Sequence, residues 1–315
     1  MIKQSAYAHD TNVKLLIGVM MIEIEFHCDE AGRLGYIDQP ENYRGEFTLV
    51  AGIIVEKHNK IAISNFCSHL SHRFKQSSTS DKFHVTDLEG NQELIRKEVF
   101  NFLKLNEIPI VYGANYFQPL HLGFVKQKQI NEDSVEKMKK QGVGLSKNLG
   151  MFKKNAQAEA FFNFYTKAMG TSLQIFNQPI LGLVKTDRID SKVYGYYVES
   201  IERFHSLNSR RPLKGRKYDY QTKEVDNFGV SVNVQIDDPN YRILFESRGE
   251  VEAIDSSISI LSDVVANSLN HHLLGYVERS NCGALNGYDA IDGYYLADQV
   301  IVQKSMDLIY PYPVA

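Results

Sequence analysis

The sequence predicts an α/β protein with one mixed β-sheet that is flanked by helices and interrupted by insertions. Two strand-like segments come first: residues 22–28 alternate apolar and polar side chains, and residues 47–55 are almost entirely apolar. Consecutive strands of this kind are typical of a hairpin. Farther along the chain, helical patterns alternate with strand-like runs, which adds further strands to the same sheet. A chain of 315 residues fits one domain with sizeable insertions, and two domains are the alternative.

The spacing of apolar residues predicts each further element. Apolar runs bounded by polar loops predict strands at residues 108–114, 180–186 and 232–236. Apolar residues three and four positions apart predict helices at residues 63–74, 95–102, 162–173, 193–204 and 256–272. Turn residues follow the first strand at Glu30-Ala31-Gly32, and a basic loop follows the fourth helix at Asn208–Lys217. We therefore expect an arm at 1–20, the α/β domain at 21–275 with a basic insertion at 118–154, and an extension at 276–315.

Composition excludes several classes of protein. Cys28, Cys67 and Cys282 are far apart and form no Cys-x-x-Cys pair, which argues against a disulfide framework and a structural zinc site. No run of 18 apolar residues is present, so we expect no membrane-spanning helix. The apolar stretch 13–22 lacks a small-residue cleavage site, so we expect no signal peptide. These features favour a cytoplasmic protein.

The net charge of −3 conceals two basic segments on an acidic remainder. Segment 118–154 contains eight lysines and three acidic residues, and segment 203–217 contains six basic residues and no acid. Localised positive charge favours a polyanionic partner, which here predicts nucleic acid, and plain solvated loops are the alternative. The candidate nucleic-acid-binding residues are Arg210, Arg211, Lys214, Arg216, Lys217, Lys139 and Lys140.

Three aspartates are placed where a metal site requires carboxylates. Asp29 ends the first strand, Asp187 ends a later buried strand, and Asp263 lies on the last helix. Neighbouring strand ends are about 5 Å apart, and Mg²⁺ and Mn²⁺ prefer oxygen ligands. Carboxylates gathered in this way should raise at least one of their pKa values when no metal is bound. The alternatives are turn residues for the two strand-end aspartates and a solvated helix surface for Asp263.

Three short motifs give the chain a resemblance to a known family. Asp29-Glu30-Ala31-Gly32 precedes the apolar segment 47–55, Phe83-His84-Val85-Thr86-Asp87 lies in the middle, and Asp255-Ser256 precedes the helical run Ile260–Ala266. In order and spacing they resemble the bacterial and phage family called domain of unknown function 3800, which is assigned to the ribonuclease-H-like fold. The chain departs from that family at Ala31, Ile260 and Ser262, where the family has Ser, Gln and Ala.

The resemblance implies a ribonuclease-H-like, metal-dependent nuclease that hydrolyses phosphodiester bonds with Mg²⁺ or Mn²⁺. It implies that Asp29, Asp187 and Asp263 hold the metal, with Glu30 as a second candidate ligand. His84 and Asp87 are candidates for a proton carrier and an outer ligand, and a strand histidine bonded to backbone is the alternative for His84. The usual hosts of the family suggest a role in phage defence, with a homo-oligomer or a defence-system protein as partner. Two alternatives remain: a non-catalytic module that binds nucleic acid or protein, and a different hydrolase that uses the Asp29/Glu30 pair.

Overall fold

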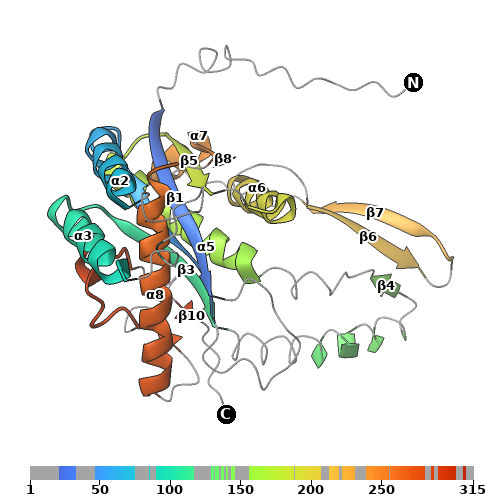
Figure 1. Ribbon diagram of the computed structural model, residues 1–315. Helices are drawn as coiled ribbons and strands as arrows, with labels where there is room; N and C mark the ends of the chain where they lie inside the picture. Colours follow the sequence, from blue (N-terminus) through green and yellow to red (C-terminus); the bar gives the residue numbers. More distant parts are fainter. Residues whose placement is uncertain are drawn as a thin grey trace, which may run out of the picture.

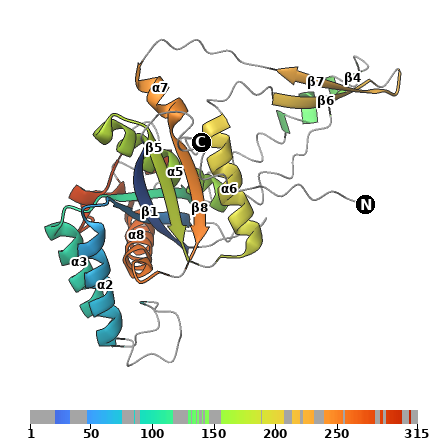
Figure 2. The same cartoon turned by 90° about the horizontal axis from the view of Figure 1, so that it is seen from above.

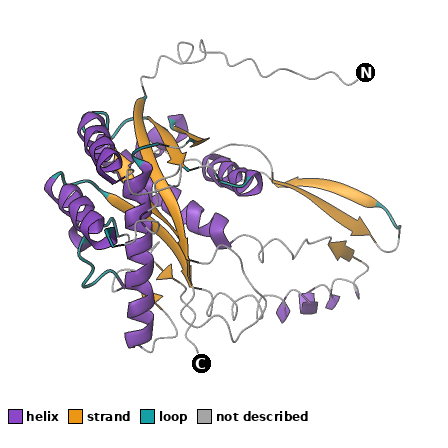
Figure 3. Ribbon diagram, in the orientation of Figure 1, coloured by secondary structure: helices purple, strands orange, loops and turns teal. Residues whose placement is uncertain are grey.

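A computed structural model describes the chain at residues 21–32, 47–74, 85, 90–116, 129–130, 132–134, 136–137, 140, 143–145, 156–187, 189–206, 213–219, 222–230, 239–254, 256–280, 285–286, 290–302 and 308–309. Its longer strands are β1 (Ile22–Gly32), β2 (Phe47–Val55), β3 (Ile110–Tyr116), β5 (Ile180–Thr186), β6 (Leu213–Asp219), β7 (Val225–Val230) and β8 (Arg248–Ala253), and the short ones are β4 (Val143–Leu145), β9 (Leu285–Asn286) and β10 (Leu308–Ile309). Its helices are α2 (Lys60–Phe74), α3 (Gln92–Leu105), α5 (Ala156–Phe176), α6 (Ser191–Ser206), α7 (Pro239–Glu246), α8 (Ser259–Ser280) and the 3₁₀ turn η5 (Ala297–Gln299). Figure 3 distinguishes these helices, strands and loops.

β1 lies in the centre of a five-stranded mixed sheet, whose strand order is β3-β2-β1-β5-β8. β1 pairs antiparallel with β2, and β2 pairs antiparallel with β3. On its other side β1 pairs parallel with β5, which in turn pairs parallel with β8. An early hairpin followed by parallel strands confirms the mixed α/β sheet that the sequence predicts.

Helices cover both faces of this sheet (Figures 1 and 2). α8 packs along β1 and β2 on one face, where buried side chains of α2 and α3 join the same core. α5 packs against β2 and β3 on the opposite face, and α6 packs against α5 and β8. The sheet is therefore the middle of three layers. None of the described helices combines the length and apolar character needed to span a bilayer.

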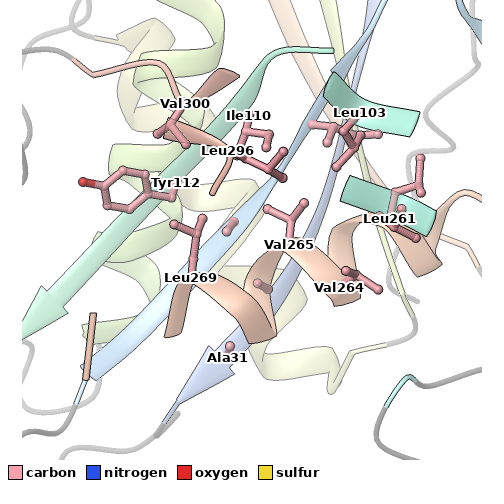
Figure 4. Packing of buried hydrophobic residues seen from close by; sticks show 14 of the residues in the cluster. Ala31, Leu103, Ile110, Tyr112, Leu261, Val264, Val265, Leu269, Leu296 and Val300 are labelled. Atoms are coloured by element: carbon pink, nitrogen blue, oxygen red, sulfur yellow. The ribbon is translucent and has the colours of Figure 1, made fainter. Parts of the chain in front are cut away.

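Successive side chains of β1 enter two separate cores, because a strand directs them to alternate faces. Phe26 and Cys28 belong to the core beneath α5 and α6, whereas Ala31 belongs to the core beneath α8. Figure 4 shows this second core, with Leu269 of α8 among its side chains. Asp29 lies two residues before Ala31, and its side chain therefore also faces α8.

β1 is longer than the sequence predicts. Residues Glu30, Ala31 and Gly32, predicted as a turn, continue the strand and pair with β2. Gly32 has φ +79°, and a Cβ built there would lie 2.3 Å from the carbonyl oxygen of Phe47. The backbone of β2 approaches so closely that a side chain does not fit, which gives a physical reason for glycine at this position.

Among the longer described strands, β6, β7 and β8 lie where the sequence pattern predicts none. β8 forms one edge of the main sheet, and its alternation is weak because Val251 is its only large apolar residue. β6 occupies part of the predicted basic loop Asn208–Lys217 and pairs antiparallel with β7. The β6–β7 hairpin extends away from the five-stranded sheet (Figure 1). The strand predicted at 232–236 lies outside the described residues.

The C-terminal segment shares the main core. The predicted boundary at residue 275 falls inside α8, which continues to Ser280. Farther on, Tyr294, Leu296 and Val300 pack into the same core as α8, and the Ile301 N–H donates to the carbonyl oxygen of Ile110 in β3. The residues 290–302 thus complete the main domain. The arm predicted at 1–20 lies outside the described residues.

Candidate acidic site at the end of the first strand

Asp29 and Asp187 occupy equivalent positions on two neighbouring parallel strands. In the pairing of β1 with β5, Cys28 lies opposite Thr186. Asp29 and Asp187 are the next residues along the two strands, and adjacent strands lie about 4.8 Å apart. Asp187 is buried and Asp29 is partly buried. The adjacent strands β1 and β5 therefore each present an aspartate near their carboxyl ends, at the same edge of the sheet.

α8 brings a third carboxylate, Asp263, to the face of the sheet that Asp29 occupies. Asp263 is only 4% exposed, which excludes the alternative of a solvated helix surface. Its Oδ2 accepts a hydrogen bond from the Val85 N–H at 2.9 Å. Its Oδ1 accepts another from the Asn267 side-chain amide at 2.7 Å. Donors therefore hold both oxygens of this buried carboxyl group.

The carboxylates act on one another electrostatically. Burial raises the pKa of Asp29 from 3.8 to about 8, and the negative charges of Asp263, Asp187 and Glu30 contribute to the rise. The hydrogen bond from the Glu30 backbone opposes it. Like charges gathered in a partly dry site have this effect because each disfavours the ionised form of the next. Without a bound cation, burial and the neighbouring negative charges therefore disfavour the ionised form of Asp29.

Glu30 belongs to the opposite side of the strand. It follows Asp29 directly, and β1 continues to Gly32 without turning, so the two side chains point to different faces. Glu30 accepts a hydrogen bond from the hydroxyl of Tyr197, which is fully buried on α6. The charge of the Glu30 side chain raises the pKa of Asp29, whereas the hydrogen bond from the Glu30 backbone lowers it. This arrangement removes the geometric basis for a hydrolase that uses Asp29 and Glu30 as a converging pair.

The three aspartates have the chemistry that a divalent cation requires, but they do not already form a complete coordination site. Asp29, Asp187 and Asp263 supply oxygen atoms, which Mg²⁺ and Mn²⁺ prefer, and their repulsion is what a cation would relieve. Within the part of the chain that the structure describes, however, no three His, Cys, Asp or Glu side chains already surround one metal position.

A buried ion-pair network adjoins the site, and the sequence patterns assign it no role. Glu25 and His27 share the face of β1 that carries Asp29, and both are buried. Their side chains form a hydrogen bond of 3.0 Å between His27 Nε2 and Glu25 Oε2, and Lys60 Nζ donates to Glu25 Oε1 at 2.6 Å. The bond to His27 lowers the pKa of Glu25 to about 2, burial opposes this, and Lys60 reinforces it. The alternation along the strand predicts that Glu25 and His27 lie on one face. It does not predict their contact with Lys60, which is remote in sequence.

Glu25→Gln is expected to destabilise the fold in a pH-dependent manner. The pKa of Glu25 is about 2 in the folded chain against 4.5 ordinarily, so its stabilisation is complete above pH 4.5 and is lost as the pH falls toward 2. We expect the free energy of unfolding at pH 7 to fall by about 1–2 kcal/mol. This is less than the pKa shift of Glu25 alone would give, because the side chain of Lys60 is half-exposed and solvent screens its interaction with Glu25. Urea unfolding between pH 2 and 7 measures it. The exposed Glu23→Gln is the matched control, and an equal loss in both variants would contradict the network.

Several predicted site residues fall outside the described part of the chain. His84, Asp87, Lys139, Arg210 and Arg211 are among them. The backbone of β6 carries Lys214, Arg216 and Lys217, so these residues belong to a strand rather than to the predicted loop. Lys140 forms an exposed ion pair of 3.3 Å with Glu136, one helical turn earlier. The predicted basic residues that the structure describes thus lie on β6 and in the insertion 118–154, whose strand β4 pairs with β6 in a three-stranded sheet of order β4-β6-β7.

No family model matches the chain, and no curated protein matches it. The similarity to domain of unknown function 3800 therefore rests on the short motifs alone. The structure gives all three motifs a physical context: Gly32 ends the central strand three residues after Asp29, and Val85 from the middle motif donates to Asp263 of the last one.

Proposed function

We propose that this protein is a metal-dependent phosphodiester hydrolase acting on nucleic acid, with Asp29, Asp187 and Asp263 as its metal-binding residues. The observation that carries the proposal is the electrostatic coupling of these side chains: Asp263 and Asp187 both raise the pKa of Asp29, which reaches about 8. A cluster that disfavours its own negative charge is costly for a fold, and a bound cation offsets that cost.

The arrangement of the sheet supports the proposal as well. A central first strand, an antiparallel hairpin and two parallel strands beyond it agree with the ribonuclease-H-like fold that the family resemblance implies. Two of the proposed ligands come from the ends of adjacent strands, and the third comes from the helix across them. Folds place catalytic groups at strand ends because rigid elements there hold side chains from distant parts of the sequence.

The chemistry divides between the ion and the protein. A divalent ion in this site would activate water and stabilise the charge that develops on the phosphate oxygens. Asp29 would release its proton on binding the ion, because a nearby positive charge favours the ionised carboxylate. Asp263 is fixed in orientation by the Val85 N–H and Asn267, and Asp187 borders the site from β5. The buried surroundings strengthen each of these electrostatic interactions.

A cleavage assay with defined substrates tests the proposal. Single- and double-stranded DNA and RNA are incubated with the purified protein in Mg²⁺, in Mn²⁺ and in EDTA. We expect cleavage that requires the metal and disappears in Asp263→Asn and Asp187→Asn, while the exposed Glu23→Gln retains it. Cleavage that persists in EDTA, or in both aspartate variants, would overturn the proposal.

A non-catalytic module that binds nucleic acid or protein is the second candidate. The observation in its favour is that no metal position surrounded by three ligands is preassembled among the described residues. Calorimetric titration with Mn²⁺ separates the two. The nuclease requires binding with sub-millimolar to millimolar affinity, whereas the module binds its partner equally well with or without the ion.

The basic β6–β7 hairpin is expected to bind the phosphate backbone. Replacing Lys214, Arg216 and Lys217 by Ala should weaken binding to single-stranded DNA. The slope of log K against log salt should fall by about 0.7–0.9 for each phosphate group that the variant no longer neutralises. Fluorescence anisotropy between roughly 50 and 200 mM salt measures the slope. The matched control replaces three exposed lysines of the main domain: Lys57, Lys97 and Lys192. An equal change of slope in the control would show that the hairpin does not bind the phosphate backbone more than other exposed lysines do.

A further inference from the structure

We propose that Asn267 is a positioning residue that holds the Asp263 carboxylate in place for metal binding. The inference rests on the proposed function of the acidic site and adds a residue to it. Asn267 lies one helical turn after Asp263 on α8. Neither the sequence motifs nor the family resemblance singles it out.

The hydrogen bonds of Asn267 identify its role. Its amide nitrogen donates to Oδ1 of Asp263 at 2.7 Å and to the backbone carbonyl oxygen of the same residue at 3.0 Å. The second bond orients the amide on the helix, and the first fixes the carboxylate. Because the Val85 N–H holds Oδ2 at 2.9 Å, the Asp263 side chain is restrained at both oxygens.

A restrained carboxylate matters because Asp263 is buried and faces other negative charges. Its charge acts on Asp29, and the two donors oppose rotation of its side chain away from Asp29. Each carboxylate oxygen has more than one lone pair, so Oδ1 can accept from Asn267 and still contact a cation. Groups that hydrogen-bond to a metal ligand in this way orient it and increase its affinity for the ion.

Other polar residues of α8 do not combine these properties. Ser268 is hydrogen-bonded to the hydroxyl of Tyr294, on the side of the helix that packs against the C-terminal segment. His272 contacts the carbonyl oxygen of Ala290 there. His271 is exposed. Among the residues on this helix whose hydrogen bonds are described, Asn267 is the one that contacts a proposed metal-binding side chain.

The experiment compares wild type, Asn267→Leu and Asn267→Ala by Mn²⁺ titration calorimetry, with the exposed His271→Ala as control. We expect the dissociation constant for Mn²⁺ to rise about 10- to 100-fold in both Asn267 variants and to stay unchanged in the control. Cleavage by the variants should recover as the Mn²⁺ concentration is raised, since the chemistry beyond metal binding is intact. Circular dichroism checks that the variants are folded.

The outcomes separate this inference from the proposed function. If the wild type binds Mn²⁺ and both Asn267 variants bind it equally well, the positioning role is overturned. The nuclease proposal is unaffected by that result. Variants that lose cleavage without recovery at high Mn²⁺ also overturn it, because the loss then lies outside metal binding. A wild-type chain that binds no Mn²⁺ overturns both. The Ala variant guards against a failure of the Leu variant caused by added volume.

Discussion

Asp29→Asn is expected to abolish metal-dependent cleavage and, in the same protein, to stabilise the metal-free fold. Loss of an outer partner of a metal ligand costs roughly 10- to 100-fold in activity, so loss of a central ligand should exceed that range. The stabilising effect follows from the pKa of Asp29, which is about 8 in the folded chain against 3.8 ordinarily. Ionising this carboxyl in the folded state is therefore unfavourable, and the neutral amide removes that cost.

The pH dependence gives this prediction a definite sign. The pKa of Asp29 is raised in the folded state, so its penalty is absent below pH 3.8, grows as the pH rises, and is complete above about pH 8. At pH 8 we expect Asp29→Asn to raise the free energy of unfolding by about 1–3 kcal/mol, below the full value of the shift because water and side-chain relaxation reduce it. Urea unfolding in EDTA measures it.

Metal dependence supplies the control for Asp29→Asn. Adding Mn²⁺ should stabilise the wild type by mass action and leave the Asn variant unchanged. Glu23→Gln, an exposed substitution on the same strand, should behave as the wild type in both measurements. An Asn variant that cleaves at the wild-type rate would remove Asp29 from the site, and one that is less stable at pH 8 would contradict the electrostatic account.

Gly32→Ala is expected to destabilise the protein by about 2–4 kcal/mol, the upper part of the usual range for single substitutions. Two effects add at this position. The residue has φ +79°, which an L side chain rarely adopts, and the new Cβ would lie 2.3 Å from the carbonyl oxygen of Phe47. Backbone cannot yield as a flexible side chain does, so the end of β1 must separate from β2.

Gly90→Ala is a matched control for this second prediction. Gly90 has φ +81°, yet a Cβ there would meet no atom within 4 Å. It should therefore lose only the cost of the left-handed conformation, about 1 kcal/mol. Guanidinium unfolding of both variants measures the difference, which isolates the close approach of β2. Equal losses would show that the approach of the Phe47 carbonyl has no energetic consequence.

The Gly32 variant also connects stability with the proposed site. Asp29 lies three residues earlier on the same strand, so separation of β1 from β2 should displace its carboxylate from Asp263. We expect Mn²⁺ affinity to fall in Gly32→Ala and to remain unchanged in Gly90→Ala. The glycine of the Asp-Glu-x-Gly motif would then serve the site through the backbone, because glycine itself has no functional group.

Local sequence by itself determined the elements with strong patterns. Alternation along β1 and the apolar run of β2 predicted both strands, and β5 was predicted with the bounds that the structure has. The position of Asp29 near the end of the first strand follows from the same local information, although β1 continues to Gly32. These features were predictable because side-chain period and burial are properties of a few neighbouring residues. The weakly apolar edge strand β8 lacked such a signal and was missed.

Only the tertiary structure decided what surrounds the three aspartates. Asp263 is buried because α8 lies across β1 and β2, although its helical pattern alone allowed a solvated position. The bond from Val85 to Asp263 spans 178 residues, and Lys60 reaches Glu25 from another element. Continuation of β1 through Gly32 turned Glu30 toward Tyr197 and away from Asp29. Such interactions depend on how whole elements pack, and a local pattern contains no information about which distant residue will complete a hydrogen bond or oppose a charge.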